Sequence, residues 1–183
     1  MYNHPNHLLN KEFDMEIIDY IKAEMTSVRR SIERVMKDMP PEIFNFPSPG
    51  TANTISATFV HLMNSEDHFI QEVLQGTPTV WKSCGWSEKT GIQKPPGIGE
   101  DWSDYKNRDI EIQPLLEYMT EVWSATDTYL SSITPDDLDR RLEFAGRERS
   151  VGDMLHLSIA QSYSHAGEIA ALKGIQGIKG LPI

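Results

Sequence analysis

The sequence predicts an all-α protein built as a four-helix bundle, and three observations support this fold class. Apolar residues recur at spacings of three and four over four long segments, each of about 20 to 30 residues. Almost no segment shows the alternation of apolar and polar residues that is typical of strands. Clusters of proline and glycine separate the four segments, and a helix does not continue through such clusters.

The first two helices have recognisable ends. The first is predicted to begin near Phe13 and to stop before Pro40, because proline cannot donate the next backbone hydrogen bond. The second is predicted over residues 54–75, with Asn53 or Thr54 as its N-cap. The first helix carries a regular apolar stripe of Ile17, Ile21, Met25, Val28, Ile32 and Val35.

A long segment between the second and third helices, residues 76–102, is rich in glycine and proline and has no periodicity. A loop of this length is unusual in a compact domain and is often functional. It permits a crossover connection in place of a plain up-and-down order of helices. Trp81 and Trp86 lie in this segment, and we expect both to pack against the bundle.

The second half of the chain repeats the pattern of long helix and short connection. The third helix is predicted over residues 102–132, and the last between its cap Ser150 and Gly174. Between them, "TPDD" at 134–137 predicts a short helical turn, because proline suits the first turn and acidic side chains favour the positive helix end. "RRLEFAGRERSV" predicts a small turn or hairpin around Gly146.

Composition narrows the function classes. The chain has 183 residues and a net charge of −10, so it repels phosphate backbones and anionic membranes, and nucleic acid is not an expected partner. Cys84 is the only cysteine, which excludes an internal disulfide. The start lacks the pattern of a signal peptide, and no stretch has the roughly 18 apolar residues of a membrane span. We therefore expect a cytoplasmic protein with a loose tail at residues 1–12 and a single domain at 13–183.

Two polar strips are the candidate sites. His61, Ser65 and His68 share a face of the second helix, and Gln161, His165 and Glu168 share a face of the last. The apolar stripe of the second helix places His61 and His68 on its solvated side. His156 lies on the opposite flank of the last helix, where a packed or capping role is expected, and His4 and His7 belong to the tail. From spacing alone, the strips are either a metal site between two helices or solvated surface.

Four stretches together resemble the DinB-like, or YfiT-type, family of metalloenzymes. They are "PSPGTANTISATFVHLMNSEDHFIQEVLQG", "TPDDLDRRLEF", "RSVGDMLHLSIAQSYSHAGEIAALKG" and the tail "GIKGLP". In the family's last helix a histidine is followed by x-Gly-Gln-Ile, and here the corresponding residues are His165-Ala-Gly-Glu-Ile. The resemblance runs from about residue 13 to the end, and it implies a four-helix bundle with a long loop between helices 2 and 3.

The resemblance also implies a metal site. In the family a divalent ion, nickel or zinc, is held by one histidine on the second helix and two ligands on the last. The corresponding residues here are His61, Gln161 and His165. Gln161 departs from the family, which has histidine or glutamate there, and a neutral amide is a poorer ligand for these ions. Glu168 and His68 are the possible substitutes.

Two functions follow from the resemblance. The first is a divalent-metal-dependent thiol transferase or hydrolase, with the ion between helices 2 and 4 and a low-molecular-weight thiol or other small molecule as partner. The second is a non-catalytic, stress-related or binding protein whose metal site has degenerated. A homodimer is expected in either case.

Overall fold

Four long helices form a bundle in the computed structural model, which describes residues 15–181. The predicted tail at 1–12, with His4 and His7, lies outside the described residues. The predicted all-α bundle is confirmed. Its long helices are α1 (Ile17–Met36), α3 (Ile55–Asp67), α6 (Ile112–Ser132) and α7 (Val151–Ile175).

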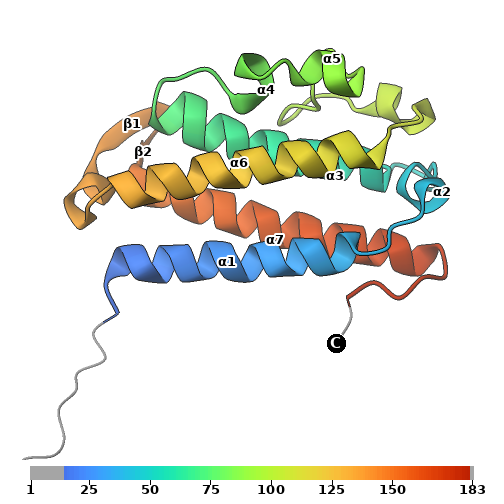
Figure 1. The fold of residues 1–183 in the computed structure, drawn as a ribbon, viewed down its shortest axis with the longest axis horizontal. Helices are drawn as coiled ribbons and strands as arrows, with labels where there is room; N and C mark the ends of the chain where they lie inside the picture. The colour runs from blue at the N-terminus through green and yellow to red at the C-terminus, as the bar shows by residue number, and fades with distance from the viewer. Residues whose placement is uncertain (1–14, 182–183) are drawn as a thin grey trace, which may run out of the picture.

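The four helices pack in the cyclic order α1, α7, α3, α6, so that α7 lies between α1 and α3. In Figure 1, α1 and α7 run in one direction, and α3 and α6 run in the other. The second and third long helices are therefore parallel, and the chain has to travel back along the bundle between them. The structure therefore has the crossover connection that the length of residues 76–102 permits.

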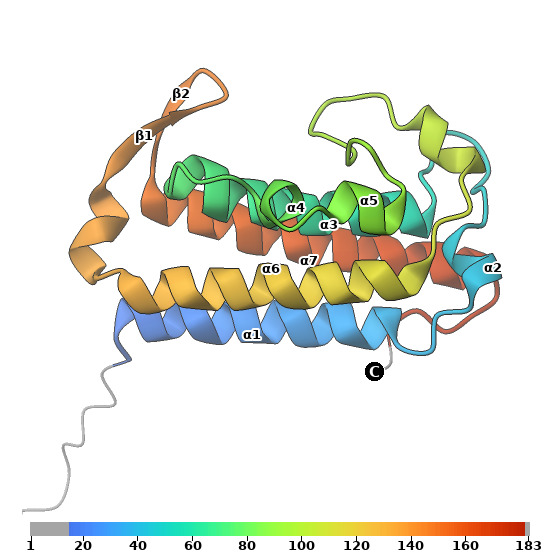
Figure 2. The ribbon, with the colours of Figure 1, turned by 45° about the horizontal axis from the view of Figure 1, so that its top comes forward.

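The crossover has structure of its own. Helix α3 continues into the π-helix η1 (His68–Leu74), after which come the short helices α4 (Val80–Ser83) and α5 (Trp86–Thr90) and the 3₁₀ helix η2 (Ser103–Asn107). Figure 2 shows α4 and α5 lying over α3 and α6, with the following loop near the start of α6. The predicted second helix is thus confirmed over its whole length, with a change of helix type at His68 that its sequence did not indicate.

A buried carboxylate attaches the crossover to the bundle. Asp67, at the end of α3, is fully buried and accepts three hydrogen bonds. Two come from the backbone N–H groups of Val80 (2.8 Å) and Trp81 (2.9 Å) at the start of α4, and one from the hydroxyl of Tyr118 on α6 (2.8 Å). Burial raises the pKa of Asp67, while these hydrogen bonds act to lower it. Asp67 therefore joins α3, α4 and α6 at one point.

The two tryptophans of the crossover are buried, as the sequence predicted. Both rings contact Tyr118, with ring centroids 5.0 Å away for Trp81 and 5.5 Å for Trp86. The indole N–H of Trp86 donates to Glu121 on α6 at 2.9 Å. Buried aromatic rings contribute most of the apolar area that fixes such a segment.

The predicted start of the third helix at residue 102 is wrong. Helix α6 begins at Ile112, and an extended stretch separates it from η2. The amide side chain of Asn45 donates to the carbonyl of Ile110 and to Asp109, and its oxygen accepts from the Ile110 N–H. Because the Asn45 side chain hydrogen-bonds to both the N–H and the carbonyl of Ile110, residues 109 and 110 do not join the helix.

The remaining connections follow local signals. The short helix α2 (Pro41–Phe44) has proline at its first position, and η3 (Pro135–Asp139) has the capping box of Thr134 and Asp137. The predicted hairpin is confirmed as β1 (Arg141–Phe144) paired with β2 (Arg147–Ser150). Ala145 and Gly146 both have positive φ, as a two-residue type I′ turn requires. The predicted caps are also confirmed: Ser150 caps α7, and Thr54 caps α3.

No helix within residues 15–181 is both long enough and apolar enough to cross a bilayer.

Replacing Asp67 is expected to destabilise the fold strongly. In Asp67→Asn, the amide has one acceptor atom for the two N–H groups of α4, so one buried N–H is left facing another donor. We expect a loss of about 2 to 4 kcal/mol in the free energy of unfolding, measured by urea denaturation.

The matched control is Asp127→Asn on α6. Asp127 is bonded to Arg29, but its side chain is 63% exposed, so the expected loss is below about 1 kcal/mol. Equal losses in the two variants would contradict the role of Asp67.

Candidate metal centre

Helices α3 and α7 lie side by side and antiparallel (Figure 2). Of the two predicted polar strips, this packing brings His61 and Ser65 next to Gln161. His61 projects from the middle of α3, and Gln161 and His165 project one turn apart from the middle of α7. The imidazole rings of His61 and His165 are edge to face, with centroids 5.0 Å apart. The structure thus brings together residues that are about 100 positions apart in the sequence.

His61 is 4% exposed, so its predicted position on a solvated face is wrong. The crossover covers the side of α3 that the apolar stripe marked as outward. The Nδ1 atom of His61 donates to the carbonyl oxygen of Pro96 at 2.8 Å, and the Trp102 ring lies 4.3 Å from the imidazole centroid. Since a carbonyl oxygen can only accept, the proton of a neutral His61 is on Nδ1 and its Nε2 carries a lone pair.

The surroundings of His61 keep it neutral. Burial lowers the pKa of the His61 imidazole, and the neighbouring His165 lowers it further. The Pro96 carbonyl and, more weakly, Glu168 act to raise the pKa. Burial is the largest of these effects, so the balance favours the neutral ring, which is the form that binds a metal ion.

Gln161 occupies the space in front of this lone pair. Its side-chain nitrogen lies 3.0 Å from Nε2 of His61 and 2.9 Å from Oγ of Ser65. Ser65 Oγ is itself 3.4 Å from Nε2 of His61. An amide oxygen turned toward His61 would oppose two lone pairs, so the hydrogen-bonding network favours the amide nitrogen there. Gln161 donates to His61 in this arrangement and does not act as a ligand.

His165 has a similar arrangement with a different partner. Its Nδ1 donates to Oε2 of Glu168 at 2.9 Å, and Thr58 on α3 donates to the other oxygen of the same carboxylate at 3.4 Å. The Nε2 of His165 has no hydrogen-bond partner among residues 15–181. The side chains of His165 and Glu168 are 18% and 36% exposed, so the His165 side of the site is the more accessible.

The other candidate histidines lie elsewhere. His68 pairs with Glu72 on η1 at 3.0 Å, and no contact joins it to His61 or His165 among the described residues. His156 is exposed on the opposite flank of α7, so the expectation of a packed histidine there is wrong. Of the two possible substitutes for Gln161, only Glu168 lies at the site, where it contacts the Nδ1 of His165.

The donor set fits a divalent ion in part. His61 and His165 each have Nδ1 bonded to an acceptor, which leaves two Nε2 atoms, and such outer hydrogen bonds are typical of metal-ligating histidines. A third strong ligand is missing: within residues 15–181, no group of three or more His, Cys, Asp or Glu side chains is placed to hold a metal ion. Two imidazoles and a neutral amide suit a weakly held ion better than a structural one.

Sequence and structural comparisons agree with this architecture. The model of the DinB superfamily matches residues 24–169, which include both strips. The chain belongs to the DinB superfamily. No curated protein sequence matches the chain.

Solved structures share the fold of this DinB superfamily member at low sequence identity. A conserved protein from Enterococcus faecalis is 19% identical with a TM-score of 0.73, over 89% of this chain and 99% of that one. YfiT from Bacillus subtilis, described as "a probable metal-dependent hydrolase with an unusual four-helix bundle topology", is 15% identical with a TM-score of 0.59, over 97% and 95%. An uncharacterised protein from Escherichia coli UTI89 is 14% identical with a TM-score of 0.58, over 90% and 96%.

Sequence reasoning did not identify three contributors to the site. The carbonyl of Pro96 and the ring of Trp102 come from the crossover, and Thr58 lies one turn before His61. A backbone carbonyl has no sequence signature, and Trp102 stood at the predicted start of the third helix. Only the spacing of Thr58 and His61, three residues apart on one helix, was visible in advance.

The lowered pKa of His61 predicts a pH dependence of stability. The pKa in the folded protein lies below the unfolded value of about 6.5, so the unfolded chain binds more protons between these two values. Acidification through this window therefore destabilises the metal-free protein, and stability returns as the pH rises. In His61→Gln this contribution is absent, so urea unfolding between about pH 7.5 and about pH 5.5 is expected to show a smaller loss than in the wild type. An equal loss in both proteins would contradict the buried, neutral state of His61.

Proposed function

We propose that the protein is a divalent-metal-dependent enzyme, a hydrolase or a thiol transferase, whose ion binds Nε2 of His61 and Nε2 of His165. The observation that carries the proposal is the pair of Nδ1 hydrogen bonds to Pro96 and Glu168. Each bond fixes the ring orientation and the tautomer of its histidine, which is what a metal ligand requires. The two imidazoles, with centroids 5.0 Å apart, are close enough for one ion to lie between them.

A bound divalent ion at this place supplies a Lewis acid that lowers the pKa of a water or thiol ligand toward neutrality. The residues of the chain prepare the site for that chemistry. Glu168 and the Pro96 carbonyl hold the Nδ1 protons, while the Trp102 ring covers His61 and excludes water from its side. To bind an ion, Gln161 would have to release Nε2 of His61, and a rotated amide would offer its oxygen as a weak third ligand.

The Bacillus subtilis protein of the same fold is described as a probable metal-dependent hydrolase, which agrees with the hydrolase alternative without deciding between hydrolysis and thiol transfer. At 15% identity this likeness supports the shared fold only. Which reaction the protein performs depends on whether the ion activates a water molecule or a thiol.

One observation favours a second function, a non-catalytic binding protein that has kept the bundle but lost the ion. Gln161, Ser65 and His61 form a closed hydrogen-bonding set that satisfies Nε2 of His61 without a metal. A buried imidazole satisfied in this way is stable as it stands. Such a protein acts through its surfaces, as a homodimer or with another partner.

Metal content decides between the two functions. The purified protein, dialysed to equilibrium against excess Zn²⁺ or Ni²⁺, is expected to retain about one ion per chain above the level of the dialysis buffer by elemental analysis, and His165→Ala is expected to lose it. The matched control His156→Ala changes an exposed histidine on the same helix and is expected to retain the ion. No retained ion in the wild type, or equal retention in His165→Ala, rejects the metal site.

Gln161→His tests the weak position of the site directly. The substitution adds an imidazole one turn from His165 in place of the amide, so the affinity for Zn²⁺ is expected to rise at least about tenfold, or about 1.4 kcal/mol, in a chelator competition titration. An unchanged affinity would show that Gln161 does not face the bound ion.

A further inference from the structure

A cavity of about 540 Å³ lies beside the candidate metal centre. It is enclosed by η1, by α4, by residues 93–98 of the crossover and by the turn of the hairpin. Its apolar wall includes Trp81, Ile98 and Phe144. The volume is within the range of small-molecule sites, which are typically apolar hollows with a few polar groups.

The cavity meets the metal centre at Ser65. This residue lines the cavity, and its Oγ is hydrogen-bonded to the Gln161 amide and lies 3.4 Å from Nε2 of His61. A molecule that fills the cavity therefore ends one side chain away from the nitrogen that binds the ion. Among the described residues that hydrogen-bond to the His61 ring or lie against it as rings, only Ser65 lines this cavity.

The π-helix η1 forms one side of the same cavity. Its wider turn begins at His68, and His68 and Glu72 both line the cavity. Glu72 accepts from His68 at 3.0 Å and from Lys82 of α4 at 3.2 Å. A π-helical turn is rare and is frequently found at functional sites. The departure from α-helical geometry at His68 thus coincides with the polar edge of the cavity.

The rim of the cavity carries two lysines in an acidic protein, each paired with a glutamate. Lys82 and Lys94 lie there, with side chains 62% and 74% exposed, on a chain of net charge −10. Their partners, Glu72 and Glu100, are also exposed, and exposed ion pairs contribute little, so either lysine can exchange its partner for an anionic ligand. Among the lining residues, Glu72 carries negative charge, whereas Lys82 and Lys94 carry positive charge.

We propose that this cavity is the substrate pocket of the candidate metal centre, and that it takes a small organic acid with an aromatic or alkyl body. The body lies against Trp81, Ile98 and Phe144, the acid group pairs with Lys82 or Lys94 at the rim, and the far end approaches Ser65. The role of this cavity as a substrate pocket rests on the proposed function. The binding of an organic acid in the cavity does not require the ion.

The test uses three probes of equal length: 4-phenylbutyrate, the amine 4-phenylbutylamine and the alcohol 4-phenylbutanol. By calorimetry on the metal-free protein, the acid is expected to bind about tenfold more tightly than the amine. The reason is that the lysines at the rim attract the carboxylate of the acid and repel the ammonium group of the amine. In the double variant Lys82→Met/Lys94→Met, this preference is expected to disappear. In Phe144→Ala, all three probes are expected to bind more weakly.

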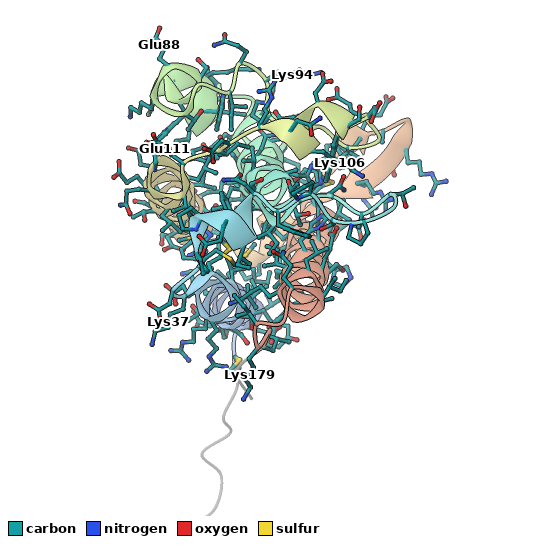
Figure 3. All side chains as sticks on the ribbon, turned by 90° about the vertical axis from the view of Figure 1, so that its right-hand side faces the viewer. Lys37, Glu88, Lys94, Lys106, Glu111 and Lys179 are labelled. Carbon is teal, nitrogen blue, oxygen red and sulfur yellow. The ribbon has the colours of Figure 1, made fainter. Side chains whose placement is uncertain are left out.

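The matched control is Lys37→Met. Figure 3 shows Lys37 on the opposite side of the bundle from Lys94, so its replacement removes one positive charge, against two in the double variant, without touching the cavity. This variant is expected to keep the preference for the acid. A lost preference in Lys37→Met, or an unchanged one in the double variant, overturns the assignment of the acid group to the rim. No binding of any probe overturns the pocket itself.

A second readout separates this inference from the proposed function. In the Co²⁺-loaded protein, 4-phenylbutyrate is expected to change the visible absorption of the ion, since the cavity ends at Ser65. Acid binding with no spectral change shows that the cavity is not the substrate pocket of the metal centre, and overturns the proposal. If the protein takes up no Co²⁺ but binds the acid in the calorimeter, the proposed function fails and the organic-acid pocket stands.

Discussion

The hydrogen bonds of Asp67 are the interaction on which the rest of the structure depends. Helices α3 and α6 are parallel (Figure 1), so the chain must return along the bundle before α6 can begin. Helices of 20 and 21 residues, such as α1 and α6, make this distance about 30 Å. Asp67 holds the start of that return by accepting from Val80, Trp81 and Tyr118 at once. A buried carboxyl group is costly, and its three hydrogen bonds offset that cost only while α4 stays in place. The crossover therefore lies on the bundle as an ordered layer.

The position of the crossover determines the chemistry of His61. By covering the outer side of α3, the crossover buries His61, brings the Pro96 carbonyl to its Nδ1 and places the Trp102 ring over the imidazole. Burial, tautomer and shielding from water thus have one structural cause. His165 depends on its own helix instead, because Glu168 lies one turn further along α7. The two histidines reach the same protonation pattern by independent routes, and the cavity at Ser65 lies where the crossover and the bundle meet.

The sequence predicted what local interactions determine. Caps such as Thr54 and Ser150, the capping box after Thr134 and the hairpin around Gly146 use contacts between residues three or four apart, and these features are visible in a single chain. The pairing of the two polar strips followed from resemblance and from helix geometry together. The family and the bundle are confirmed by the comparisons.

Features that depend on distant parts of the chain were not predictable in the same way. The burial of His61 depends on a crossover that has no periodicity, so the apolar stripe of α3 indicated the wrong face. The late start of α6 depends on Asn45, more than 60 residues earlier in the chain. No pattern in the sequence indicated the π-helical turn at His68 or the cavity beside it.

The tautomers of His61 and His165 test the central claim most directly. Long-range ¹H–¹⁵N NMR of the metal-free protein near neutral pH distinguishes a proton on Nδ1 from one on Nε2. The account predicts Nδ1–H in both rings, because Pro96 and Glu168 accept those protons, and a shift of both Nε2 resonances when Zn²⁺ is added. An Nε2–H tautomer in either ring, or Nε2 resonances that Zn²⁺ leaves unchanged, would contradict it.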